Sequence, residues 1–167
     1  NGMELGDDTI TVGFLYKTAT VTPVGSSATI PDGYGAADLG TSCGSGLDGV
    51  YPFDNWNRKP LAQTFRDADG ETFTVVINHF KSKGSLTGYS LDNDQGDGQG
   101  NNNCTRTRAA ATLISWLATD PTSSSDPDFI VMGDLNAYAM EDPVTEFTSA
   151  GYVNAISGYS YVYAGQW

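Results

Sequence analysis

A strand, helix and strand in succession constrain the fold of this chain more than any other feature. ETFTVVINH, residues 71–79, ends in a β-branched run, and DFIVMGD, residues 128–134, is a short apolar run typical of a strand buried on both faces. Between them, TRTRAAATLISWLATD, residues 105–120, predicts a helix. Its apolar stripe, at positions i, i+3, i+4 and i+7, consists of Ala110, Leu113, Ile114 and Leu117. Strands that alternate with helices predict a layered α/β architecture.

The preceding half of the chain predicts further strands. LAQTFRD and ETFTVVINH flank ADG, so residues 61–79 predict a β-hairpin that turns at this tripeptide. TITVGFLYK, residues 9–17, and ATVTPV, residues 19–24, predict two adjoining strands. Residues 25–57 are rich in Gly, Ser, Asp and Pro without a clear period, which predicts a long surface excursion.

The remaining segments are a loop, a helix and a last strand. Residues 84–103 are rich in glycine and amides, and a loop of this length inside a domain is usually functional or mobile. The Asp-Pro pair at 142–143 predicts the N-cap and first turn of a helix through Ala150, which Gly151 would end. GYSYVYAGQW, residues 158–167, predicts the start of another strand.

Charge and composition limit the partners of the chain. Its 167 residues carry a net charge of −12, which repels nucleic acid and anionic membranes, so a polyanionic ligand requires a locally positive region. No apolar run approaches the roughly 20 residues of a membrane span, and no membrane partner is expected. Twenty glycines and few lysines resemble a secreted protein. In that setting Cys43 and Cys104 are expected to form a disulfide, with two separate thiols as the alternative.

Three polar residues form the candidate site. His79 and the triplet Asp134-Leu135-Asn136 each occur where a β-run stops, so their side chains can project from a rigid scaffold into one cleft. Phosphodiester hydrolysis uses an oxygen ligand for a hard cation such as Mg²⁺, a group that orients the attacking water and donors for the transition state. A carboxylate, an amide and an imidazole provide those groups.

Four segments, in order, resemble one family. NRKPLAQTF, VVINHFKSKG, DGQGNNNCTRTRAAATLISWL and VMGDLNAYAMEDP look like the endonuclease/exonuclease/phosphatase superfamily, most closely its bacterial extracellular nucleases. The resemblance extends from Ile10 to Trp167. It implies a layered α-β-β-α sandwich, incomplete here, and a secreted, divalent-metal-dependent nuclease that hydrolyses DNA or RNA phosphodiester bonds.

The resemblance also implies roles for the matching residues. His79 would donate to the scissile phosphate, and Asp134 and Asn136 would position water, phosphate oxygens and Mg²⁺, with Mn²⁺ or Ca²⁺ as alternative metals. Arg58 would contact the phosphate region. Charge and proximity in sequence add four expected contacts to the nucleic-acid backbone, which are Lys81, Lys83, Arg106 and Arg108.

The chain departs from the family pattern at both ends. That pattern begins with an asparagine and a metal-binding glutamate and ends with an aspartate-histidine pair, and residues 1–167 contain neither. The resemblance therefore implies the middle and late part of a larger catalytic domain. Missing segments of the same parent chain would be its partners, and the 167 residues alone are expected to show no turnover.

Other functions remain open at this point. A non-catalytic surface or filament component that retains the fold is the main alternative, and a phosphatase or lipid phosphodiesterase of the same superfamily is another. GTSCG would make Ser42 a hydrolase nucleophile, but it lacks a flanking strand and helix, and His79 precedes Asp134, opposite to the α/β-hydrolase order. DNDQGDGQGNNN suggests calcium but lacks the glycine and glutamate of an EF-hand loop.

Overall fold

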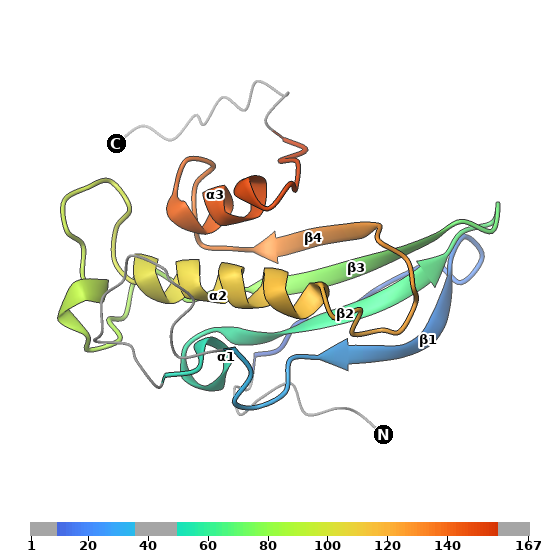
Figure 1. Ribbon diagram of the computed structural model, residues 1–167, viewed down its shortest axis with the longest axis horizontal. Coiled ribbons are helices and arrows are strands. Elements are labelled where there is room, and N and C mark those ends of the chain that lie inside the picture. The colour runs from blue at the N-terminus through green and yellow to red at the C-terminus, as the bar shows by residue number, and fades with distance from the viewer. Residues whose placement is uncertain (1–9, 36–49, 157–167) are drawn as a thin grey trace.

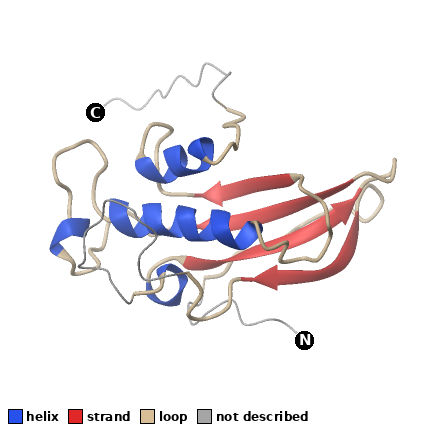
Figure 2. Cartoon of the chain, viewed as in Figure 1, coloured by secondary structure: helices blue, strands red, loops and turns tan. Residues whose placement is uncertain are grey.

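The computed structural model describes residues 10–35 and 50–156, which form a mixed α/β structure with one four-stranded sheet in the order β1-β2-β3-β4 (Figures 1 and 2). The strands are β1 (Thr22–Thr29), β2 (Arg58–Arg66), β3 (Thr72–His79) and β4 (Phe129–Asp134). The helices are α1 (Pro52–Asn55), α2 (Asn103–Leu117) and α3 (Asp142–Ser149), with a 3-10 turn at Ser90–Asp92. None of the helices in these ranges has the length and apolarity that crossing a membrane requires.

Two antiparallel pairings and one parallel pairing make up the sheet. β1 with β2 and β2 with β3 pair antiparallel, and the predicted hairpin is confirmed with Arg66 opposite Thr72. β3 and β4 pair in parallel, and the long connection that contains α2 provides the crossover that parallel pairing requires. The strand, helix and strand predicted from the sequence therefore form one unit.

The core lies between the sheet and α2, which crosses one face of the sheet in Figure 1. Val76 of β3 and Ala62 of β2 are fully buried on this face. Ala110 and Leu113 of the predicted stripe are also fully buried, and each aliphatic side chain of the size of leucine contributes about 1.5–3 kcal/mol when it leaves water. The apolar stripe of the helix is thus confirmed.

The opposite face of β4 is exposed. Ile130 and Met132 are 46% and 48% exposed, and the register places them beside Val75 and Ile77 of β3. The prediction that residues 128–134 are buried on both faces is therefore wrong. β4 is the last strand of the described sheet, and α2 covers only one of its faces.

The first predicted strand is wrong in its described part. Residues 10–17 join no ladder, and their aromatic side chains pack on β2 instead: the rings of Phe14 and Tyr16 lie 5.6 and 5.2 Å from that of Phe65. Arg58 donates from Nε to the carbonyl oxygen of Ile10 at 2.9 Å. Aromatic packing and this hydrogen bond hold the segment against β2.

The surface excursion predicted for residues 25–57 contains packed structure. β1 continues through Thr29, and Ile30 is fully buried in the core. Phe53 of α1 is 3% exposed and contacts Phe80 at a ring distance of 6.1 Å. Only a few apolar residues make these contacts, and they are not spaced with a regular period. The composition of the stretch therefore did not reveal them.

The last helix agrees with its prediction within one residue. Glu141 rather than Asp142 occupies the N-cap position of α3, and Gly151 follows the helix with a φ of +92°. The predicted strand at 158–167, the Ser42 alternative and Cys43 lie outside the described residues. The disulfide between Cys43 and Cys104 therefore stays a prediction.

Candidate active site

Three predicted site residues meet at one edge of the sheet. Arg58 begins β2, His79 ends β3 and Asp134 ends β4, and the register pairs Arg58 with His79 and His79 with Asp134. Parallel β3 and β4 reach their carboxyl ends at the same edge, and antiparallel β2 starts there. Strand direction and register therefore place Arg58, His79 and Asp134 at neighbouring positions on three adjacent strands.

The imidazole and the carboxylate face each other. His79 Nε2 lies 3.8 Å from Asp134 Oδ2, and the two side chains are 32% and 63% exposed. This separation is longer than a direct hydrogen bond, so both groups can bind a third species. Solvent reaches the pair and weakens its mutual attraction, and a ligand can reach it as well.

Asn136 connects the loops that follow the two strands. Its backbone N–H donates to Asp134 Oδ1 at 2.8 Å, and its Nδ2 donates to the carbonyl oxygen of Phe80 at 2.9 Å. Its φ of +48° lies in the left-handed region that asparagine tolerates better than most residues. Asp134 therefore caps a turn with Oδ1 and presents Oδ2 toward His79, while Asn136 retains its side-chain oxygen as an acceptor.

The oxygen atoms of the site could supply some of the ligands that a hard divalent cation requires. Mg²⁺ usually keeps several waters and takes one or two carboxylates together with substrate phosphates. Asp134 Oδ2 and Asn136 Oδ1 are ligands of that kind. Within residues 10–35 and 50–156, no group of three or more His, Cys, Asp or Glu residues is placed to hold a metal ion. Water and a substrate phosphate would therefore have to complete the coordination.

Lys81 lies close to this edge of the sheet. Its backbone N–H donates to Asn57 Oδ1 at 2.8 Å, and its Nζ donates to Ser85 Oγ at 2.7 Å. Partial burial lowers the pKa of Lys81; the charges of Arg106 and Arg58 lower it further, and Asp92 opposes them. Arg58 begins β2 and Lys81 follows His79 by two residues, so two positively charged side chains come from segments at these strand ends.

Lys83 is held by other protein groups. Its Nζ lies 2.5 Å from Oε1 of Glu141, whose side chain is 6% exposed, and 4.7 Å from the centre of the Tyr138 ring. The sequence predicted a contact with the nucleic-acid backbone. In the structure this charge has a carboxylate partner instead.

The structure corrects the expected positions of Arg106 and Arg108, which are 0% and 4% exposed. Arg106 donates to main-chain oxygens of the preceding loop, among them that of Asn101 at 2.7 Å, and Arg108 donates to that of Val50 at 2.9 Å. Burial lowers the pKa of Arg106, and the carboxylates of Glu141 and Asp92 oppose this. Neither guanidinium reaches a surface where a phosphate backbone could lie. Arg106 precedes Ala110 by four residues on the buried stripe, a signal already present in the sequence.

Asp92 is a structural residue that sequence reasoning missed. Its carboxylate is 1% exposed and accepts hydrogen bonds from Thr87 Oγ1 at 2.7 Å and from the N–H and Oγ1 of Thr105 at 3.0 and 2.7 Å. It therefore fixes the long loop to the start of α2. Asp94 and Asp97 instead accept backbone N–H groups within the loop, so the three carboxylates do not converge as calcium binding requires.

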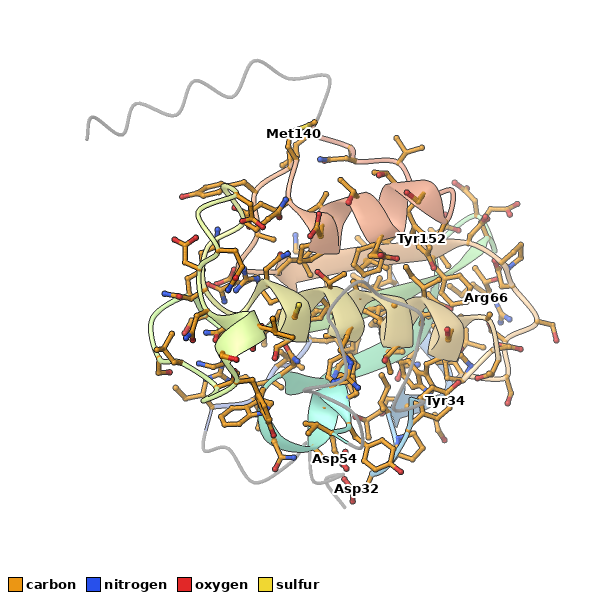
Figure 3. The ribbon with its side chains drawn as sticks, turned by 60° about the vertical axis from the view of Figure 1, so that its left-hand side comes forward. Asp32, Tyr34, Asp54, Arg66, Met140 and Tyr152 are labelled. Carbon is orange, nitrogen blue, oxygen red and sulfur yellow. The ribbon has the colours of Figure 1, made fainter. Side chains whose placement is uncertain are left out.

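A groove of about 1180 Å³ runs along β4 and α3 and reaches the site. Its lining includes Asp134 and the exposed Ile130 and Met132. On the α3 side, the rings of Phe147 and Tyr152 meet edge to face at 5.6 Å; Tyr152 is labelled in Figure 3. The carboxylate thus stands at the end of a largely apolar surface.

Comparisons of the chain with protein-family models, curated proteins and solved structures produced no match.

Proposed function

We propose that this chain is part of a secreted, divalent-metal-dependent nuclease that hydrolyses phosphodiester bonds of DNA or RNA. The domain would be an α-β-β-α sandwich of the endonuclease/exonuclease/phosphatase type. The observation that carries the proposal is the convergence of Arg58, His79 and Asp134 on three adjacent strand ends, with Asn136 bonded to the same loops.

Each residue has a chemical role in this proposal. Asp134 and Asn136 hold Mg²⁺, which when bound supplies Lewis-acid stabilisation of the phosphate oxygens. His79 donates a hydrogen bond or proton to a phosphate oxygen, a type of contribution typically worth about 10²–10⁴ in rate. Arg58 neutralises part of the phosphate charge, and Lys81 adds positive potential nearby.

The uncovered sheet face supports the sandwich. Val75 and Ile77 of β3 lie beside Ile130 and Met132 of β4 on the face opposite α2, and the last two are about half exposed. A second sheet packed about 10 Å away would bury this surface. It would also place the strand-end residues at the rim between two sheets. Other segments of the complete gene product are the proposed source of that layer.

Plasmid nicking and RNA cleavage by the complete gene product test the function. His79→Ala and Asp134→Ala should each lower Mg²⁺-dependent cleavage by at least about 10²-fold, and chelation of the metal should abolish it. The matched control is Asp69→Ala, which removes an exposed carboxylate at the opposite end of β3 and should cleave like the wild type. Near-normal cleavage by both site variants would refute the proposal. The 167 residues alone are expected to show no turnover.

A non-catalytic component that retains the fold is the second candidate. The observation in its favour is that Asp134 is the one carboxylate found at the described strand-end site, and no metal-binding cluster occurs in the described ranges. This candidate predicts nucleic-acid binding without cleavage in Mg²⁺, Mn²⁺ or Ca²⁺. Cleavage that depends on Asp134 excludes it.

A further inference from the structure

An exposed aromatic ring stands beside the candidate site. Tyr138 is 61% exposed and follows Asn136 by two residues, so their Cα atoms lie within about 7 Å of each other. The carbonyl oxygen of Tyr138 accepts a hydrogen bond from the N–H of Glu141 at 2.9 Å, which closes the loop before α3. The ring therefore belongs to the loop that leaves β4 at Asp134.

The Tyr138 ring is held in place from one side. Lys83 Nζ lies 4.7 Å from its centre and is fixed by Glu141 at 2.5 Å. The stem of Lys83 passes so close to Gly100 that a Cβ there would lie 3.2 Å from Lys83 Cδ. Lys83 comes from the loop after β3, so this contact joins the same two loops that Asn136 joins.

The open part of this ring can accept a flat partner. The ammonium of Lys83 covers one ring face, so the exposed area lies on the other face and the edges. Base–aromatic stacking tolerates any sequence because every base has a π-face, and it requires a base that is not already stacked on both sides.

We propose that Tyr138 stacks on an unpaired base of the strand whose phosphate lies at His79 and Asp134. This inference rests on the proposed nuclease function and makes it more specific: the site should favour single-stranded or locally unpaired nucleic acid over a continuous duplex. In this arrangement Lys83 supports the platform and does not contact a phosphate itself.

Binding of labelled oligonucleotides to the complete gene product, measured by fluorescence anisotropy at fixed salt, tests the inference. The probes are a short single strand, a strand of equal length made of abasic residues, and a blunt duplex. Tyr138→Ala should weaken binding of the single strand about 5- to 100-fold and leave abasic binding unchanged, whereas Tyr138→Phe should bind like the wild type. Met140→Ala is the matched control, because Met140, which is labelled in Figure 3, lies on the same loop and is 83% exposed.

The outcomes separate this inference from the nuclease proposal. If Tyr138→Ala binds the single strand as the wild type does, or loses abasic binding equally, the stacking role is refuted even when Asp134→Ala abolishes cleavage. If the wild type binds none of the three probes, both proposals fail. Urea midpoints of the Tyr138 variants equal to the wild type would show that the fold is intact, and Tyr138→Leu, a second non-aromatic variant, should behave like Tyr138→Ala.

Discussion

Replacing Asp92 by asparagine should destabilise the protein with almost no change in side-chain volume. The buried carboxylate accepts three hydrogen bonds, one from Thr87 and two from Thr105, at 2.7 to 3.0 Å. A carboxylate can accept all three because both of its oxygens are acceptors. An amide has one oxygen and an NH₂ group, so in either orientation an N–H faces a donor unless a threonine hydroxyl turns around.

The magnitude follows from the three bonds. A hydrogen bond to a charged group contributes about 1.5–3 kcal/mol, and one between neutral groups about 0.5–1.5 kcal/mol. Replacing three hydrogen bonds to a charged group by three between neutral groups costs about 3 kcal/mol. Removal of the buried charge offsets part of this cost, so the free energy of unfolding should fall by about 2 kcal/mol. With a urea slope of about 1–3 kcal/mol/M, the midpoint should fall by about 1 M.

Urea unfolding followed by circular dichroism measures this effect, and amide hydrogen exchange locates it. The amide of Thr105, which donates to Asp92, should lose protection, because the loop before α2 opens more readily. The matched control is Asp94→Asn, whose exposed carboxylate accepts one bond from the N–H of Gly96; its stability should stay within about 0.5 kcal/mol of the wild type. Equal stability of the Asp92→Asn and Asp94→Asn proteins would contradict the argument.

Two further predictions concern a glycine next to the site, with a second glycine as its control, and a surface carboxylate. Gly133→Ala should lower the free energy of unfolding in urea by several kcal/mol, because the new Cβ would lie 2.1 Å from a main-chain oxygen of β3. The control is Gly70→Ala, which also lies at positive φ but in open space and should lower it by only about 1–2 kcal/mol. The Thr72 hydroxyl is the main cause that lowers the pKa of Asp126, so Thr72→Val should raise this pKa in an NMR titration. Because this pKa is lowered in the folded protein, the ionised carboxylate stabilises the fold at pH values above its unfolded-state pKa, and the stabilisation is lost as pH falls through the folded-state pKa. An unchanged Asp126 titration in Thr72→Val would contradict the role of the Thr72 hydroxyl.

Much of the fold was predictable because its signals are local. The stripe through Ala110 and Leu113 identified α2 and its buried face, and the ADG turn identified the hairpin. Two predictions failed where tertiary packing overrode a local signal. Residues 10–17 have the alternation of a strand, but their aromatic rings pack on Phe65 outside any ladder. Arg106 was expected on the surface by its charge, although its spacing from Ala110 placed it on the buried stripe.

The candidate site was predictable in its members but not in its contacts. His79 and Asp134 each end a predicted strand, and parallel pairing then makes them neighbours. The sequence could not show that Asn136 donates a hydrogen bond to Phe80, because the two residues are 56 positions apart in the chain. Nor did it single out Tyr138, whose position depends on a lysine from another loop.

The sequence by itself determined the order of the elements, the face that α2 buries and the polar residues at the strand ends, because periodicity and chain direction are properties of neighbouring residues. Tertiary structure decided which of several similar residues are buried. Asp92 rather than Asp94 anchors the long loop, and Lys83 rather than Lys81 pairs with Glu141. Residues of the same type look alike in sequence, and only the packing of distant segments determines which carboxylate loses its water and which lysine gains a partner.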